Sequence, residues 1–432
     1  MAKFIVRRLL LMIVTMLGAS MLIFVVSEAA PGNVARNILG QFASPEQEAS
    51  LRAQLGLDRP LPTRYLAWLV GSDWMASRRI GLPLTRLTDD RGYQQWWAVD
   101  TDGTLVQWKL DGVDLVQVRR GDDGGVSEKV DNARWQTSSE GETFFWGVNN
   151  KNRAVKWVLG GGQTVWQLTT SGWITQQGGP VEYIPLSKGF VRGDPGESVK
   201  TGRPVVTTLV SRVKNSLLLA AIAFAIVMPL ALVLGLIAGL YEGRFIDRFL
   251  SLMGLVTTAT PEFALGVILI VVFASWLRIL PGATVFPSDN AAFTNPKMLV
   301  LPVMTLTLVE LGYVLRMTRS SMIDVMNQPY IRTAILKGLP YRQIVFGHAL
   351  RNALLAPITV IMLHVNWLVG GIVVVESIFG FPGLGRFIYE AAMAKDVFAI
   401  EAGAMIMVTV AVTTQLAADV IYTFLNPRIR YA

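Results

Sequence analysis

The chain alternates between long apolar segments and one long polar stretch. Six apolar segments reach the roughly 20 residues that an α-helix needs to cross a bilayer. They span residues 4–26, 214–240, 249–277, 299–318, 354–376 and 401–425. Between the first two, from 74 to 189, apolar residues occur only in short alternating runs. This pattern predicts a helical membrane protein that is interrupted by a different kind of domain.

The polar stretch carries the signals of antiparallel strands, and no helix is expected in it. Its short apolar runs end at Asp-Gly, Asn-Asn and Gly-Gly turns. The segments Trp97–Trp108 and Trp146–Trp157 share one Trp-to-Trp spacing, and Trp166–Trp173 is a shorter third copy, so we interpret them as repeated hairpins. The predicted domains are a first span with its outer segment (1–73), a β insert (74–189) and a core with five spans (190–432).

The tryptophans of the insert have two alternative roles. A row of indole rings can bind sugars or peptide side chains by stacking, or it can form the core of a small β domain. We favour the core. Because the chain has no Cys, packing alone must hold this domain together.

The distribution of basic residues predicts the topology. The short outside loops carry only Arg278, Lys297, Arg386 and Lys395. The segments expected inside carry Lys3, Arg7, Arg8, Arg244, Arg248, Arg316, Arg319, Arg332, Lys337, Arg342, Arg351, Arg428 and Arg430. By the positive-inside rule, both termini are expected in the cytoplasm and the insert outside. The alternative, that the first segment is a cleaved signal peptide, is disfavoured because its apolar run is too long.

Composition narrows the function classes. The chain is 52% hydrophobic and only 16% charged, against about a quarter charged in soluble domains. Its net charge of +8 comes with basic residues that border the spans, which favours membrane lipid over nucleic acid. With no Cys, two His and no Gly-Lys dipeptide, we expect no metal site, no catalytic triad and no ATP-binding P-loop.

A basic loop over 319–353 separates the fourth and fifth apolar segments. Residues 330–336 predict a short helix, Gly338 allows the backbone to turn, and Pro340 prevents the helix from continuing. We interpret this loop as a rigid knob that docks on a partner. The alternative is an ordinary positive-inside loop without a partner.

Four motifs, in order, resemble permeases of the dipeptide/oligopeptide/nickel branch of ABC importers, in particular the B-type subunit. They are residues 7–9 with 30–32 and 55–61, residues 193–198 with 201–205, the loop just described, and residues 375–386 with 426–431. The resemblance covers about 1–72 and 190–432, whereas the insert departs from the family pattern.

The resemblance implies an all-α integral membrane protein with the six transmembrane helices of a type I ABC importer permease. The small antiparallel β domain would be inserted on its outer face. It further implies a prokaryotic inner membrane, a second homologous permease, two ATPase subunits that bind ATP and Mg, and an external solute-binding protein. The ATPase-coupling residues would be Tyr330, Arg332, Thr333, Ala334, Gly338 and Arg342. Arg332 stands where the family motif usually has Glu, so ion pairs of other branches are not carried over.

Polar residues inside the spans are candidates for the translocation path, because a bilayer makes them costly. Glu310 lies near the middle of the fourth span, and the alternative is a neutral or hydrogen-bonded Glu packed between helices. In the fifth span, Thr359, Asn366 and Gly370 share one helix face, while His364 lies on the other and is expected to be packed. Asp419 is expected to pair with an Arg of a loop.

The outer end of the fifth span has the composition of a turn. Pro382, Gly383 and Gly385 interrupt the helix after Glu376 and Phe379. The resemblance implies that these five residues form an outer pore loop.

Two other function classes remain open. An ATP-independent secondary transporter or channel would be expected to show inverted repeats, and a membrane-anchored sensor would use the β insert. The sequence does not distinguish peptides from oligosaccharides, nickel complexes or opines as the substrate.

Overall fold

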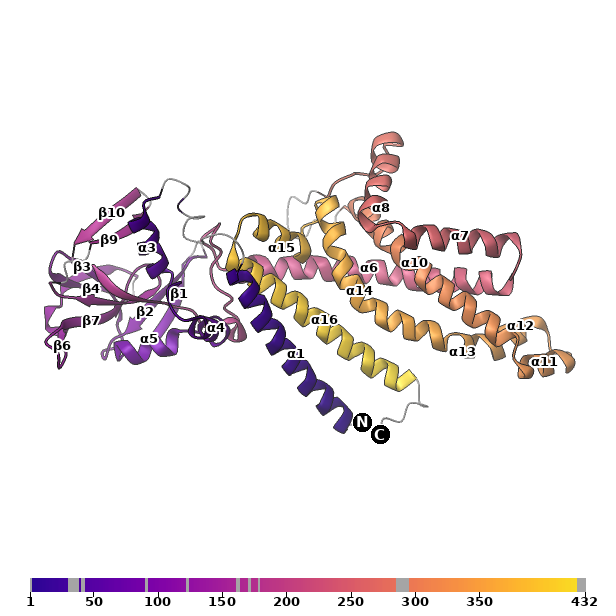
Figure 1. Ribbon diagram of the computed structural model, residues 1–432, viewed down its shortest axis with the longest axis horizontal. Helices are drawn as coiled ribbons and strands as arrows, with labels where there is room; N and C mark the ends of the chain where they lie inside the picture. The colour runs from indigo at the N-terminus through magenta and orange to yellow at the C-terminus, as the bar shows by residue number, and fades with distance from the viewer. Residues whose placement is uncertain are drawn as a thin grey trace. The chain divides into compact units, whose positions relative to one another are not determined.

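The structure is a computed structural model that describes residues 2–29, 39, 43–89, 92–121, 124–160, 164–169, 172–177, 179–284 and 295–425. The chain divides into two compact units (Figure 1). The first, here called the helical unit, comprises Met1–Ser20, Leu209–Glu390 and Gly403–Ala432. The second, here called the mixed unit, comprises Met21–Thr208 and Ala391–Ala402.

Long apolar helices dominate the first unit. Its elements, several of which extend into the second unit, are α1 (Ala2–Ala29), α6 (Val205–Leu240), α7 (Phe245–Ala259), α8 (Glu262–Leu269), η3 (Ile270–Trp276), α10 (Lys297–Met326), α11 (Pro329–Leu336), α12 (Tyr341–Gln343), η4 (Ile344–Ala349), α13 (Leu350–Ala353), α14 (Leu355–Phe379), α15 (Leu384–Met393) and α16 (Val397–Leu425). The segments η3 and η4 are π-helical.

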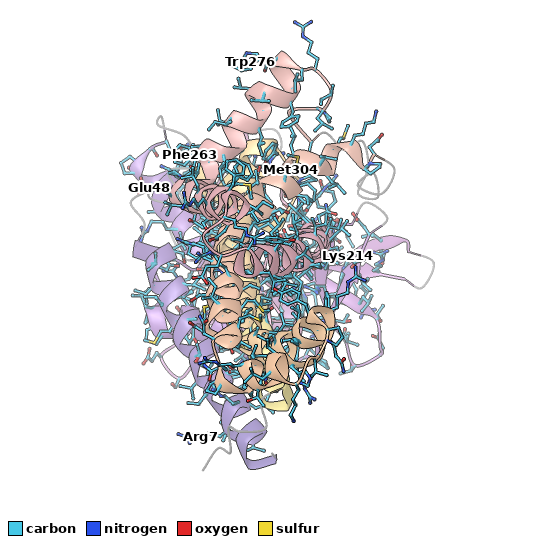
Figure 2. All side chains as sticks on the ribbon, turned by 90° about the vertical axis from the view of Figure 1, so that its right-hand side faces the viewer. Arg7, Glu48, Lys214, Phe263, Trp276 and Met304 are labelled. Atoms are coloured by element: carbon cyan, nitrogen blue, oxygen red, sulfur yellow. The ribbon has the colours of Figure 1, made fainter. Side chains whose placement is uncertain are left out.

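Helix α10 is the centre of the helical unit. It packs side by side with α7 and α14 (Figure 1). Of the residues in its most apolar stretch, 72% are buried. In the other four helices that are long and apolar enough to cross a membrane, among the described residues, this share is 11–33%. At the opposite extreme, Phe263 on α8 and Trp276 on η3 project outward (Figure 2) and are 58% and 76% exposed. Such apolar surface is expected to face lipid or another subunit.

The number of membrane spans depends on how bent helices are counted. Among the described residues, five helices are long and apolar enough to cross a membrane, and up to seven if each bent pair is one span. One bend, of 108°, separates α7 from α8 at Pro261, which immediately precedes α8 and cannot continue α7. The other, of 72°, separates the end of α14 from α15. The predicted count of six lies between these numbers and stays a prediction.

Over its described residues, the mixed unit contains three antiparallel sheets. Their strands are β1 (Leu84–Thr88), β2 (Gln94–Val99), β3 (Leu105–Asp111), β4 (Asp114–Arg120), β5 (Val126–Val130), β6 (Gln136–Thr137), β7 (Thr143–Val148), β8 (Arg153–Val158), β9 (Thr164–Thr169), β10 (Gly172–Gln177) and β11 (Pro180–Pro185). The sheet orders are β1-β2-β3-β4-β5, β11-β8-β7-β6 and β10-β9. The predicted antiparallel β insert is therefore present.

The repeated tryptophan spacing corresponds to a repeated hairpin. In β2–β3, Ala98 pairs with Val106, and in β7–β8, Gly147 pairs with Val155. Each pair follows the first Trp of its segment by one residue and precedes the second by two, so the two hairpins have the same register. The third segment is the hairpin β9–β10, in which Trp166 pairs with Thr175.

Trp108, Trp146 and Trp157 of the two main hairpins belong to the core of the mixed unit, and Trp97 is buried outside that cluster. Trp97, Trp108, Trp146 and Trp157 are 1–7% exposed. Trp108 lies so close to Gly147 that a Cβ there would be 2.8 Å from its ring. The favoured interpretation of these residues, as core, is confirmed. The alternative, a row of Trp rings that binds a ligand by stacking, would require exposed rings, and these four rings are buried.

The mixed unit also contains helices. They are α3 (Pro45–Gln54), α4 (Leu61–Val70), α5 (Asp73–Ile80), η1 (Asn132–Arg134) and η2 (Phe190–Arg192). Of these, α3 packs on β9 and β11, α5 on β7, and α4 on η2. The expectation that 74–189 contains no helix is therefore wrong for α5. This helix begins with Asp73, ends at Gly81 in the left-handed conformation, and buries Ala76 in the tryptophan core. Because α5 has only eight residues, its pattern of apolar positions is too short to predict a helix from the sequence.

Candidate coupling and translocation sites

The loop that follows α10 folds into a compact knob. Helix α11 starts at Pro329, whose fixed φ suits the first position of a helix, and the chain turns at Gly338, where φ is +73°. Ile331 and Ala334 of α11 are buried in one apolar cluster with Met322 of α10. The predicted short helix and turn are present, and the knob is fixed to the end of α10.

The outward side of this knob is apolar and exposed. Its large apolar side chains, with their exposed fractions, are Tyr330 (41%), Ile335 (54%), Leu336 (81%), Tyr341 (56%) and Phe346 (63%). Arg332, Thr333, Gly338 and Arg342 are exposed as well. Of the predicted coupling residues, only Ala334 is turned inward. An exposed apolar patch with a basic rim is typical of a surface that another protein covers.

Glu310 is completely buried at the centre of the helical unit. Its Oε2 lies 2.8 Å from Nδ1 of His364 on α14, and His364 packs on the ring of Tyr313 at 5.0 Å between centroids. The angles do not favour a hydrogen bond, and among the described residues neither oxygen of Glu310 has one. The Glu310 carboxylate on α10 and the His364 imidazole on α14 are therefore in contact without a hydrogen bond. The place of Glu310 in a translocation path stays a prediction.

The other predicted path residues lie on α14. Thr359 donates its hydroxyl to the carbonyl of Leu355 at 3.0 Å, which satisfies it within the helix. Asn366 and Gly370 belong to the helical backbone, but their side-chain surroundings lie outside the described part of the chain. The role of this helix face stays a prediction.

The turn after α14 is held by a buried carboxylate. Glu376 is 0% exposed, accepts from the hydroxyl of Ser216 on α6 and from the backbone N–H of Arg386 at 3.1 Å. The Ser216 hydroxyl in turn accepts from the backbone N–H of Leu384 at 2.7 Å. Glu376 thus caps the first turn of α15 and attaches it to α6.

The remaining predicted outer-loop residues are also packed inward. Phe379 is 1% exposed, and Gly383 and Gly385 are buried. Asn215 of α6 donates to the carbonyl of Pro382 at 2.9 Å. These contacts define a rigid turn, and its role as a pore loop stays a prediction.

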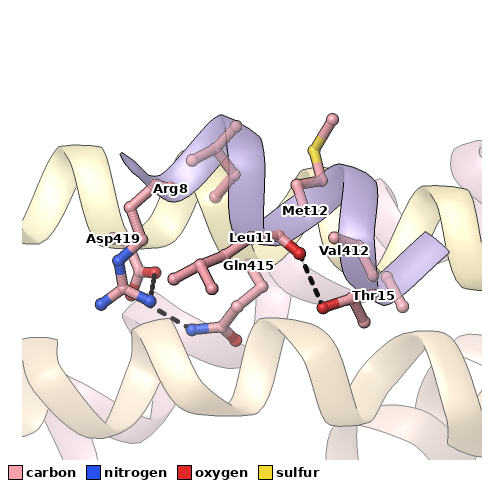
Figure 3. A pocket seen from close by; sticks show the side chains of 9 residues that line it. Arg8, Leu11, Met12, Thr15, Val412, Gln415 and Asp419 are labelled. Atoms are coloured by element: carbon pink, nitrogen blue, oxygen red, sulfur yellow. Dashed lines mark hydrogen bonds and ion pairs between the residues drawn. The ribbon is translucent and has the colours of Figure 1, made fainter. Parts of the chain in front are cut away.

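A cavity of about 240 Å³ lies between α1 and α16 (Figure 3). Its polar end is the ion pair between Arg8 and Asp419, 3.0 Å apart, with the Gln415 amide donating to Asp419 at 3.2 Å. Asp419 was expected to pair with an Arg of a loop, but its partner is on a helix. The rest of the lining is mostly apolar, as for Leu11 and Val412.

Two carboxylates that sequence reasoning missed hold helix ends. Asp396 is 2% exposed and accepts from the hydroxyl of Ser198 at 2.5 Å and the backbone N–H of Val199 at 3.2 Å, at the start of α16. Asp247, also 2% exposed, pairs with Arg319. In the sequence, the signal for each is a lone Asp just before or inside the first turn of an apolar helix.

Comparison with known proteins agrees with this architecture. The family model described as "Binding-protein-dependent transport system inner membrane component" matches residues 231–431, and the N-terminal model of the same system matches residues 1–81. All strands of the insert lie between the two matches. The insert is therefore additional to the family domain.

Curated relatives are permeases. The "Oligopeptide transport system permease protein AppB" of Bacillus subtilis is 35% identical over 254 residues, which cover 58% of this chain and 80% of that protein. The "Dipeptide transport system permease protein DppB" of Haemophilus influenzae is 42% identical over 157 residues, 36% of this chain and 45% of that protein. A solved chain described as "Crystal structure of an amino acid ABC transporter with histidines" matches with TM-score 0.38 and 15% identity, over 52% of this chain and 94% of that one.

The chain belongs to the family of binding-protein-dependent transport system inner membrane components. It is a membrane-embedded permease subunit of an ATP-driven ABC importer. This membership favours the permease over a self-sufficient secondary transporter and over a sensor.

Proposed function

We propose that this permease imports peptides and that ATPase subunits dock on residues 327–342 of the knob. The exposed apolar side of that knob carries the proposal. Leu336 is 81% exposed at its tip, although Ile331 of the same helix is fully buried. A helix as short as α11 is not stable alone, so packing of its buried side holds it in place. Its exposed side remains available to bind a partner. Peptide as the substrate rests on the names of the relatives above.

The proposed assembly follows from the family. A second permease would complete the translocation path, two separate ATPase subunits would hydrolyse ATP, and an external binding protein would deliver the peptide. Six spans with both termini in the cytoplasm put the basic knob on the same side as the ATPases, which agrees with the positive-inside rule. The β insert then lies on the outer face, where the binding protein arrives.

Within the helical unit, Glu310 is the proposed path residue with the strongest physical argument. A carboxylate in a span must be neutral, paired or hydrated, and the nearby His364 supplies a partner in this conformation. Opening of a path between α10 and α14 would separate the two side chains and expose the carboxylate to water. Thr359, Asn366 and Gly370 would line the same path from α14.

The docking surface is tested by changing its tip and its hinge separately. Leu336→Asp should weaken co-purification of the ATPase subunits, because it places a charge in an apolar interface. Gly338→Val should keep the subunits together but uncouple ATP hydrolysis from uptake, since a β-branched residue is strained at φ +73°. Gly347→Ala is the matched control, because that position has room for a Cβ and no positive φ. Unchanged association and coupling in both variants would contradict the proposal.

A further inference from the structure

The turn between α6 and α7 is fastened to α10 by one ion pair. Arg319 of α10 donates from Nε to one oxygen of Asp247 and from Nη2 to the other, the second at 2.9 Å. The Asp247 side chain is almost completely buried, at 3% exposure, and the Arg319 side chain is 30% exposed. Two parallel donations from a planar guanidinium fix both distance and orientation, unlike a single contact.

The same carboxylate organises the turn that it joins to α10. Its Oδ2 accepts the backbone N–H of Gly243 at 2.8 Å, and its Oδ1 accepts the hydroxyl of Ser251 at 3.2 Å. Gly243 has φ +74°, so the turn depends on a conformation that most residues avoid. Asp247 therefore connects the end of α6, the start of α7 and the side of α10.

Close packing prevents these three helices from sliding past one another. A Cβ at Gly235 of α6 would lie 2.6 Å from the carbonyl oxygen of Leu315, and one at Gly239 would lie 2.8 Å from Cβ of Met322. On the other side, a Cβ at Gly312 of α10 would lie 2.2 Å from the carbonyl oxygen of Gly254 on α7. Packed surfaces of this kind move as a body or separate, but do not deform gradually.

The knob is attached to these packed helices at Met322, near the C-terminal end of α10. Met322 follows Arg319 by one helical turn and is fully buried in the cluster that holds Ile331 and Ala334 of α11. A displacement of α11 therefore reaches α10 at Met322, and it reaches the α6–α7 turn through the ion pair one turn further along.

We propose that Asp247 and Arg319 are positioning residues that transmit movement of the knob to α6 and α7, so that α6, α7 and the second half of α10 move as one body. The pair acts through other residues and touches no substrate. The inference rests on the proposed docking of ATPase subunits on the knob, and it identifies where the docking force enters the spans.

The first test measures peptide uptake per ATP hydrolysed in the reconstituted importer. Asp247→Asn and Arg319→Gln should each lower uptake per ATP by about five-fold, the size of a modest coupling between sites. The amount of assembled complex and its ATPase rate should stay close to wild type. Arg319→Lys should give an intermediate uptake per ATP, because it keeps the positive charge but loses the two parallel hydrogen bonds of the guanidinium. Asp419→Asn, which removes the similar pair with Arg8, is the control and should keep uptake per ATP unchanged.

The second test uses the absence of native cysteine in this chain. A chain with Asp247→Cys and Arg319→Cys should be uncoupled, and a short bifunctional thiol reagent that joins the two positions should restore uptake per ATP. If bridging the pair abolishes uptake, α7 and α10 move against each other and the proposal is wrong. It is equally wrong if the single variants lose assembly, ATPase rate and uptake in the same proportion, because the pair is then only structural. Failure of the docking proposal is distinct, since Leu336→Asp and Gly338→Val would then leave association of the ATPase subunits and coupling unchanged.

Discussion

Gly383 lies directly against the buried carboxylate of Glu376, and a Cβ at this position would be 2.0 Å from Oε1. The carboxylate caps α15 and is attached to α6 through Ser216, so it cannot move away without breaking those bonds. The Phe-Pro-Gly-Leu-Gly run thus needs glycine for space at this position, whereas Gly338 needs it for backbone conformation and has open space around it.

Gly383→Ala should therefore destabilise the helical unit. We expect a loss of about 2–4 kcal/mol, the usual range for overpacking combined with a disturbed buried hydrogen bond. The measurement is the thermal stability of the purified permease in detergent. Gly266→Ala is a control in the same unit, because its nearest neighbours are side-chain atoms at 3.5 Å, an ordinary van der Waals distance. Equal melting temperatures for Gly383→Ala and wild type would contradict the capping role of Glu376.

Glu310→Gln should reduce uptake more than it reduces assembly. The amide keeps the volume of the side chain but removes the charge that a path residue would offer, so the ratio of uptake to assembled complex is the quantity to measure. His364→Ala provides the comparison, because it leaves a buried carboxylate without its neighbour and should lower assembly itself. A cysteine at position 310 gives an independent readout. If small aqueous thiol reagents fail to modify it in every transport state, Glu310 does not line the path.

The mixed unit should fold alone, provided that its helices are included. Ser50 and Gln54 of α3 donate to the backbone carbonyl of Trp166 at 2.6 and 2.5 Å, and Ala53 packs on the tryptophan core. A fragment of residues 43–189 should therefore melt cooperatively, with β-type circular dichroism, at a higher temperature than the predicted domain 74–189. If 74–189 is equally stable, α3 contributes nothing to the core. A random-coil spectrum for both would refute an independent domain.

The insert should lose stability in acid through Asp100. Burial opposes ionisation of this carboxyl, but hydrogen bonds from Arg134, from the backbone of Thr101 and from Gln117 outweigh it, so its pKa lies below the ordinary value of 3.8. Because the pKa of Asp100 is lower in the folded state than in the unfolded state, its ionised form stabilises the fold at pH values above the unfolded-state pKa. This stabilisation is lost as the pH falls through the folded-state pKa. The melting temperature of the 43–189 fragment should therefore fall below about pH 4. Asp100→Asn should cost about 1–3 kcal/mol at pH 7 and flatten this acid dependence, and an unchanged profile would contradict the assignment.

The sequence predicts the apolar helices and the hairpins because both depend on local periodicity, but it does not reveal the 108° bend that divides the predicted span 249–277. A run such as 4–26 is apolar over the length of a bilayer whatever surrounds it, and the equal Trp spacings already imply equal hairpin registers. The knob could be predicted for the same reason. Pro329, Gly338 and Pro340 fix the backbone by their own geometry, independent of contacts.

The pairings between distant residues could not be predicted in this way. Nothing in the sequence states that Asp247 meets Arg319, that Glu310 faces His364, or that Gly383 lies on Glu376, since each pair joins elements whose relative rotation depends on packing. The short helix α5 was missed because its burial on the tryptophan core, rather than its own period, stabilises it. Local backbone preferences thus determined which elements form, whereas the close approach of glycine-bearing helices and the need to pair buried charges decided which side chains meet.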